Sequence, residues 1–192
     1  MEKHKVTYTI YKFLLAPIFL LYYRPKFINK NYIPKKGPVI FCGNHMHVYD
    51  QCFPMLSTNR MIHYLAKKEY FDSKFKWFFK SAGCISVNRN IKDETAKASA
   101  LELLKKGYAV GIFPEGTRNK TDNLLLPFKF GAVSMAEKTN SYIVPFAITG
   151  KYKFKKNNLK ITFAKPFKVE GSLEEANNKL YEEIKKLLLL NK

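Results

Sequence analysis

The sequence predicts an α/β domain with a mixed, largely parallel sheet flanked by helices, preceded by an N-terminal helical motif. Strand-like apolar runs alternate with helix-length amphipathic segments along most of the chain. Polar and charged residues directly follow several of those runs, where sheets of this class bind ligands. With 192 residues, 46% of them hydrophobic, the chain is long enough for one domain with a sizeable core.

Residues 1–31 are expected to form an N-terminal helical segment that associates with a membrane. The apolar stretch 13–23 is shorter than the ~18 to 20 residues that span a bilayer. Tyrosines and basic residues flank it, a pattern typical of a helix in the membrane interface: Tyr8, Tyr11, Tyr22, Tyr23, Lys3, Lys5, Arg24 and Lys26. A packed core helix and a spanning helix both remain open. No small-residue cleavage site follows, so a removed signal peptide is not expected.

The main domain is predicted to cover residues 32–192, beginning at a turn-rich boundary over 32–38. Apolar runs predict six strands, over 38–43, 61–66, 83–89, 108–116, 142–150 and 159–167. Helical periodicity predicts helices over 44–59, 68–82, 92–107, 129–140 and 172–190. The segment 92–107 has the clearest signals, because acidic residues come first, lysines come last and Gly107 stops it. Ser172 is a plausible N-cap for the last helix.

The formal charge of +19 indicates a polyanionic partner, such as nucleic acid, an anionic membrane surface or a phosphorylated metabolite. Against nucleic acid, the lysines are dispersed and no nucleic-acid-binding motif is present. Arginine is rare here, and its rigid fork suits bidentate binding of phosphate or carboxylate. The positions of the arginines therefore deserve more weight than the total charge. They are Arg24, Arg60, Arg89 and Arg118.

The segment FCGNHMHVYD, residues 41–50, places two histidines and an aspartate after an apolar run. His45 and Asp50 are five residues apart, about 500° on a regular helix, so they meet only if His45 lies in a loop or first turn. A carboxylate bonded to one imidazole nitrogen fixes the tautomer and leaves the other nitrogen free to accept a proton. His47 and Asp50 could form a rival pair, and spacing does not decide between them.

A metal site is a further interpretation of this segment, because possible ligands crowd within eleven positions: Cys42, His45, His47, Asp50 and Cys52. Closed structural zinc sites usually have paired ligand spacings, which this segment lacks. We therefore expect no metal. The three cysteines form no CxxC pair, and reduced thiols are the better interpretation.

The segment FPEGTRNK, residues 113–120, follows the fourth predicted strand and suits a phosphate monoester. Gly116 would allow close approach of the backbone, free N–H groups could bind oxygens, and Arg118 could clasp two of them. An ordinary turn with a solvated arginine remains the alternative. Arg89 lies at the end of the third predicted strand and would face the same cleft.

Four segments in order carry a resemblance to a known family: NHMHVYD, GCISVNR, FPEGTR and IVPF, within residues 44–146. The chain resembles the glycerolipid acyltransferases, most closely the PlsC-type 1-acyl-sn-glycerol-3-phosphate acyltransferases. The resemblance implies that His45 is the catalytic base and Asp50 its partner. It implies that the acceptor's glycerol phosphate is bound by Arg89, Glu115, Gly116, Thr117 and Arg118. Pro145 would help to place the acyl donor or substrate, and His47 is a departure, since many members have serine there.

The activity implied by the resemblance is transfer of a fatty acyl group from a thioester, acyl-CoA or acyl-ACP (acyl carrier protein), to the sn-2 hydroxyl of 1-acyl-glycerol-3-phosphate. The product would be phosphatidic acid, and no metal or other cofactor would be needed. The expected partners are a membrane lipid substrate, the acyl donor and an anionic membrane surface at the cytoplasmic face, with no nucleic acid. The alternatives are acylation of another lysophospholipid or of glycerol-3-phosphate. A more distant one is a non-catalytic basic module that binds membrane or nucleic acid.

Overall fold

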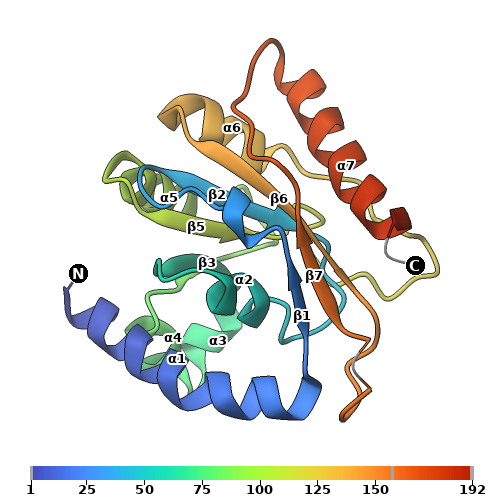
Figure 1. Ribbon diagram of the computed structural model, residues 1–192. Coiled ribbons are helices and arrows are strands. Elements are labelled where there is room, and N and C mark those ends of the chain that lie inside the picture. Colours follow the sequence, from blue (N-terminus) through green and yellow to red (C-terminus); the bar gives the residue numbers. More distant parts are fainter. Residues whose placement is uncertain (1, 157, 191–192) are drawn as a thin grey trace.

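Seven strands form one mixed sheet with helices on both faces in the computed structural model, which describes residues 2–156 and 158–190 (Figure 1). The strands are β1 Lys26–Ile28, β2 Val39–Gly43, β3 Ile62–Lys67, β4 Ile85–Val87, β5 Ala109–Ile112, β6 Tyr142–Thr149 and β7 Lys160–Phe163. Their order in the sheet is β1-β7-β6-β2-β5-β3-β4. All pairs are parallel except β6 with β7.

The helices cover the two faces of this sheet. They are α1 Glu2–Tyr23, α2 Cys52–Ser57, α3 Lys68–Asp72, α4 Lys76–Ser81, α5 Glu94–Lys105, α6 Gly131–Thr139 and α7 Leu173–Leu190, with a 3-10 turn at Lys30–Tyr32. In β2, Ile40 and Cys42 join the core under α5, α6 and α7. Val39 and Phe41 join the core on the other face, which contains Phe53 of α2. This is the alternation that a strand buried on both faces requires.

The predicted α/β class is confirmed, and two of the predicted helices have different limits. The segment 68–82 forms two short helices, α3 and α4, because Ser73 between them has an extended backbone with φ −90° and ψ 171°. The helix predicted from residue 44 begins only at Cys52. Residues 44–47 form a loop and 48–51 a turn instead, and the side chain of Asp50 accepts hydrogen bonds from backbone N–H groups in the loop.

The strand β1 was not predicted from the sequence. It pairs in parallel with β7, with Lys26 opposite Lys160 and Ile28 opposite Thr162. Three residues are too few to show alternation, and the partner strand lies near the other end of the chain. The sheet therefore begins before residue 32, inside the segment assigned to the N-terminal motif, whose boundary stays a prediction.

Helix α1 lies along one side of the domain with most of its apolar residues exposed (Figure 1). By length and composition, His4–Tyr23 could cross a membrane, and only 11% of its most apolar window is buried. Tyr8 and Phe19 pack against the domain. The hydroxyl of Tyr11 hydrogen-bonds to that of Ser81 at 2.7 Å, so the helix is also fixed by polar contacts. The large apolar side chains of α1 that are exposed are Val6, Ile10, Phe13, Leu14, Leu15, Ile18, Leu20, Leu21 and Tyr22.

Candidate active site

The carboxyl ends of three parallel strands on one side of the sheet, β2, β5 and β4, place the polar residues singled out in the sequence at the same edge. His45 follows β2, Arg89 follows β4 and Glu115 follows β5. Strands β2 and β5 pair in parallel, with Cys42 opposite Ile112, so the segments after them emerge at the same edge of the sheet. This is the edge at which open α/β sheets bind ligands.

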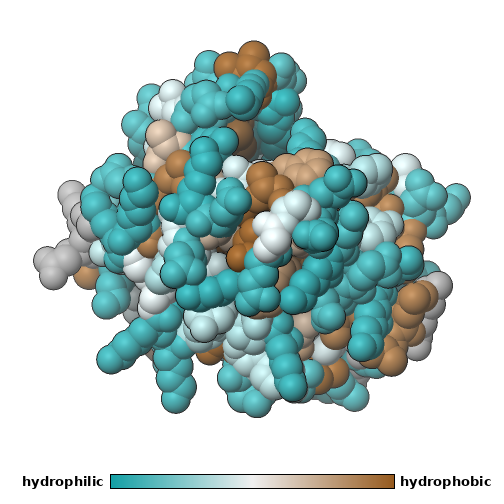
Figure 2. All heavy atoms as spheres, turned by 90° about the horizontal axis from the view of Figure 1, so that it is seen from above, coloured by the Kyte–Doolittle hydropathy of each residue, from teal (hydrophilic) through white to brown (hydrophobic). Residues whose placement is uncertain are grey.

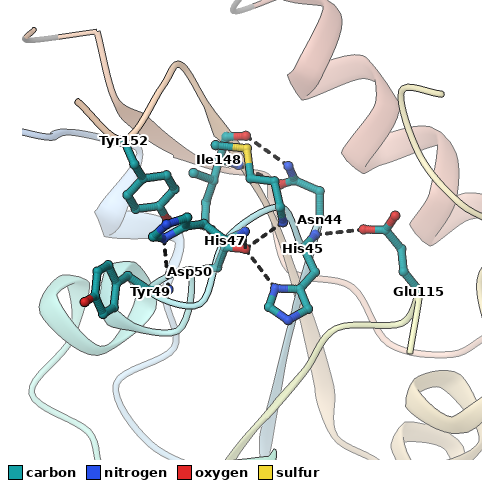
Figure 3. A network of polar contacts seen from close by, with 9 residues as sticks. Asn44, His45, His47, Tyr49, Asp50, Glu115, Ile148 and Tyr152 are labelled. Atoms are coloured by element: carbon teal, nitrogen blue, oxygen red, sulfur yellow. Dashed lines mark hydrogen bonds and ion pairs between the residues drawn. The ribbon is translucent and has the colours of Figure 1, made fainter. Parts of the chain in front are cut away.

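His45 and Asp50 form a hydrogen-bonded pair. The Nδ1 atom of His45 lies 2.8 Å from Oδ2 of Asp50, whose side chain is fully buried, while that of His45 is 12% exposed (Figure 3). The imidazole stacks on Phe113, with ring centroids 4.1 Å apart and planes inclined by 13°. A carboxylate on Nδ1 holds the proton there and leaves Nε2 as an acceptor.

Hydrogen bonds to Asp50 hold this segment in its non-helical conformation. They also show which of the two histidine rings pairs with the carboxylate. Its Oδ2 atom accepts hydrogen bonds from the backbone N–H groups of Met46 and His47, each at 2.7 Å. His47 therefore contacts the carboxylate through its backbone, while its ring stacks on Tyr152 (Figure 3). The imidazole that pairs with Asp50 is that of His45. Burial lowers the pKa of His47, and the nearby Asp50 charge opposes that shift.

The carboxylate of Glu115 accepts hydrogen bonds from two backbone N–H groups at the site. Its Oε1 atom accepts a hydrogen bond from the N–H of His45 at 2.7 Å, and its Oε2 atom accepts one from Leu126 at 2.9 Å. The side chain is buried, and burial raises its pKa, while these two donors oppose the shift. Both oxygens are thus used within the protein. The contact with glycerol phosphate that the resemblance implies for Glu115 stays a prediction.

Backbone hydrogen bonds hold the turn after β5 together and connect it to His45. The N–H of Gly116 donates to the Phe113 carbonyl at 2.9 Å, and the N–H of Asn119 donates to the His45 carbonyl at 2.7 Å. Gly116 has φ +73°, which favours glycine, and a Cβ atom there would lie 2.9 Å from Cε of Lys129. The N–H groups of Gly116 and Asn119 are therefore not free for a ligand. Thr117 and Arg118 are exposed.

A cavity of about 410 Å³ joins several of these residues. Its wall includes His45, Arg89 and Gly116, while Arg118 and Pro145 are absent from the described residues that line it. Pro145 is instead buried in β6 opposite Cys42. The basic lining residues are Arg89, Lys92, Lys97 and Lys129, and the large apolar ones are Leu65, Val87, Ile91, Ile112, Phe113, Phe130 and Met135. The cavity can accommodate an anionic group next to an apolar one.

Three residues at the site were not predicted from the sequence. Lys129 lines the cavity, but in a lysine-rich chain nothing distinguishes it. Asn44 is buried and clamps β6, accepting a hydrogen bond from the Ile148 N–H at 2.8 Å and donating one to its carbonyl at 3.0 Å. Tyr152 donates a hydrogen bond to Oδ1 of Asp50 at 2.5 Å from a position 102 residues away. The position of Asn44 directly after a strand was the one available signal.

Within the described ranges, no group of three or more His, Cys, Asp or Glu side chains could hold a metal ion. Cys42 is buried in β2, where burial raises the pKa of its thiol. Burial also raises the pKa of Cys52, to about 12. These thiols are therefore protonated and packed. The expectation that the reaction uses no metal or other cofactor stays a prediction.

The fold and the site define an α/β protein with a histidine–aspartate pair at the carboxyl ends of its strands, beside a basic and apolar cavity. The chain matches the Acyltransferase family over residues 24–149 and belongs to that family.

The similar proteins carry consistent names. The chain is 35% identical over 147 residues to a 1-acyl-sn-glycerol-3-phosphate acyltransferase of Bacillus subtilis, covering 73% of this chain and 72% of that one. It is 34% identical over 119 residues to the protein of that name from Borreliella burgdorferi, covering 60% of this chain and about half, 47%, of that one. The crystal structure of PlsC, the 1-acyl-sn-glycerophosphate (LPA) acyltransferase from Thermotoga maritima, has the same fold. It superposes with a TM-score of 0.73 at 23% identity, covering 91% of this chain and 78% of that one.

Proposed function

We propose that this protein transfers a fatty acyl group from a thioester to the sn-2 hydroxyl of 1-acyl-glycerol-3-phosphate. The observation that carries the proposal is the His45–Asp50 pair, with 2.8 Å between Nδ1 and Oδ2, whose His45 lines a cavity that Arg89 also lines. The names of the similar proteins supply the acceptor and the reaction. Acyl-CoA and acyl-ACP are both proposed as donors.

His45 acts as the general base in this mechanism. Its Nε2 atom removes the proton of the acceptor hydroxyl as the hydroxyl oxygen attacks the thioester carbonyl carbon. The new C–O bond forms, the C–S bond then breaks, and the leaving thiolate can take the proton from the imidazolium. Asp50 stabilises the imidazolium while it exists. Because the thioester is already activated, the step requires neither a metal nor a covalent enzyme intermediate.

The basic residues of the cavity bind the acceptor's phosphate. Arg89 lines the same cavity as His45, and Lys129 lies beside Gly116 at that wall. A cation that holds the phosphate presents the hydroxyl to His45 in a fixed geometry, which replaces a diffusional encounter by an oriented one. The apolar part of the wall suits the acyl chain of either lipid.

The proposed location is the cytoplasmic face of a membrane. The exposed apolar residues of α1 enter the lipid, and the basic residues of the chain contact its anionic head groups. Each basic side chain near an anionic leaflet contributes about 1 kcal/mol, so a few of them supplement the helix. Both lipid substrates then remain in the bilayer during the reaction.

The test is an assay of the purified protein with 1-acyl-glycerol-3-phosphate and each thioester donor in turn. Wild type is expected to form phosphatidic acid. His45→Ala is expected to abolish turnover, and Asp50→Asn to lower kcat by about 100-fold to 10,000-fold because the tautomer of His45 is no longer fixed. Near-normal turnover by His45→Ala would refute its role as base.

The same assay separates the other functions. Turnover with glycerol-3-phosphate or another lysophospholipid, but none with 1-acyl-glycerol-3-phosphate, would change the proposed acceptor. Salt-sensitive binding to DNA with no turnover of any acceptor would favour a binding module without catalysis.

A further inference from the structure

We propose that Tyr152 is a positioning residue of this site, whose hydroxyl sets the orientation of the Asp50 carboxylate and through it that of His45. The inference rests on the proposed function only for its kinetic consequences. The orienting effect of Tyr152 on Asp50 and His45 is expected in the protein without substrate as well. Tyr152 lies between β6 and β7, after the last of the four segments that carry the family resemblance.

The hydrogen bonds of Asp50 divide unequally between its two oxygens. Oδ2 accepts from His45 Nδ1 and from the backbone N–H groups of Met46 and His47. Oδ1 accepts from the Tyr152 hydroxyl, at 2.5 Å, and no other donor to it is seen among residues 2–156 and 158–190. Because the side chain of Asp50 is fully buried, an Oδ1 without a donor would remain unsatisfied. Together with the three donors to Oδ2, Tyr152 therefore restrains the rotation of the carboxylate plane about its Cβ–Cγ bond.

The ring of Tyr152 is held in place independently of its hydroxyl. The His47 ring stacks on it with centroids 4.0 Å apart (Figure 3). Tyr23, the last residue of α1, meets it edge-on at 5.5 Å, and Phe53 does so at 5.9 Å. A phenylalanine at position 152 would keep these ring contacts and lose only the hydrogen bond.

The segment that contains Tyr152 is also tied to the end of α1. The backbone N–H of Lys155 donates to the carbonyl of Tyr22 at 2.9 Å, and the rings of Phe154 and Tyr22 lie 4.8 Å apart. These contacts do not involve the Tyr152 hydroxyl. Removal of that hydroxyl should therefore leave the segment in place.

Tyr152 is unsuited to direct acid–base chemistry on the substrate. Its hydroxyl points at Asp50, and Tyr152 is not among the residues that line the cavity with His45. Burial, followed by the Asp50 charge, raises its pKa far above the usual range, so the hydroxyl stays protonated and acts as a donor. Its effect on the reaction is thus transmitted through the carboxylate.

The experiment compares Tyr152→Phe with Tyr23→Phe, which removes a hydroxyl from the same ring cluster without touching Asp50. Tyr152→Phe is expected to lower kcat at least tenfold, with the KM of the acceptor changed less than about threefold, because binding groups are untouched. Tyr23→Phe is expected to behave like wild type. Thermal unfolding of each variant shows whether it is folded. A folded Tyr152→Phe with kcat within twofold of wild type would overturn the proposal.

A second measurement needs no activity. Nitrogen-15 NMR of protein with labelled histidines reports which ring nitrogen of His45 carries the proton, and His45→Ala assigns that signal. Tyr152→Phe is expected to shift the His45 ring signals and Tyr23→Phe to leave them in place. Unchanged His45 signals in Tyr152→Phe would contradict the proposal even if kcat fell.

The NMR result also separates this inference from the proposed function. If the His45 signals shift in Tyr152→Phe but the wild-type protein has no acyltransferase activity, the proposed function is refuted and the positioning role of Tyr152 is supported. Should Tyr152→Phe fail to fold, Asp50→Ala offers the reciprocal test in a chain that keeps the tyrosine. A slowly exchanging hydroxyl proton of Tyr152 is expected in wild type and should be lost in Asp50→Ala, which removes the oxygen that accepts it. Its absence from wild type, or its persistence in the variant, would overturn the proposal.

Discussion

Single carboxylates organise this site by binding backbone N–H groups as well as other side chains. Glu115 joins His45 to Leu126, and Asp50 joins the turn to the imidazole. In Glu115→Gln, the amide NH2 group must face one of two N–H donors. We expect a loss of about 1–3 kcal/mol in folding free energy and a lower kcat, measured by urea unfolding and turnover.

Glu137→Gln is the matched control for this substitution, because Glu137 is exposed on α6. Its stability and turnover should equal those of wild type. If Glu115→Gln raised only the KM of the acceptor and left the folding free energy unchanged, Glu115 would contact substrate, as the family resemblance implies.

The arginines at the site differ in their position relative to His45. Arg89 lines the cavity with His45, whereas Arg118 is exposed and is not among its lining residues. Arg89→Gln is therefore expected to raise the KM of the acceptor about 10-fold to 100-fold, the range of a lost hydrogen bond to a charged group. Arg118→Gln should have the smaller effect, in steady-state assays that vary acceptor and donor separately. A larger effect of Arg118→Gln would assign the phosphate to the turn after β5.

At the scale of helices and strands, the features that the sequence predicts are those that depend on residues close together in the chain. The sequence predicts helix α5 from its acidic start, its final lysines and Gly107 as a stop, and in the structure Asp93 caps it by accepting a hydrogen bond from the Ala96 N–H. The His45–Asp50 pair could be suspected because its spacing is local. Strand β1 depends on pairing with β7, and Tyr152 depends on a contact across 102 residues. Such contacts leave no periodic signal, so they were missed.

Strand β3 carries a histidine that should make stability depend on pH. Burial lowers the pKa of His63 from its usual 6.5, and the hydrogen bond to the Gly83 carbonyl opposes that shift. The other groups near it are the Tyr108 ring and His4. Since the folded pKa lies below the unfolded one, the unfolded state binds more protons under acidic conditions. Stability is therefore fully present above about pH 6.5 and falls as the pH decreases below it.

The check is the urea midpoint of wild type and His63→Gln at about pH 7.5 and pH 5.5. The variant is expected to be less stable at the higher pH, because it loses the contact between β3 and the turn before β4. Its midpoint should also change less between the two pH values. An equal pH dependence in both proteins would show that His63 contributes none of it.

The whole molecule is asymmetric in the chemistry of its surface. Seen from the side of α6 and α7, it is largely hydrophilic with scattered apolar groups (Figure 2). On α1, by contrast, Phe13 is 77% exposed and Leu21 is 69% exposed. Tyr23 at the end of α1 contacts Tyr152, which binds Asp50. A membrane that covers α1 would therefore lie a few side chains from Asp50.

Membrane binding is expected to depend on the exposed apolar side of α1. Burial of one large apolar side chain contributes about 1.5–3 kcal/mol, so removal of three should weaken attachment by well over tenfold. The test is cosedimentation of Phe13→Ala/Ile18→Ala/Leu21→Ala with vesicles that contain an anionic phospholipid. Leu189→Ala/Leu190→Ala is the control, because these leucines are exposed at the end of α7. Equal loss of binding in both variants would indicate general adhesion of apolar surface, and no loss in the α1 variant would show that charge alone holds the protein to the membrane.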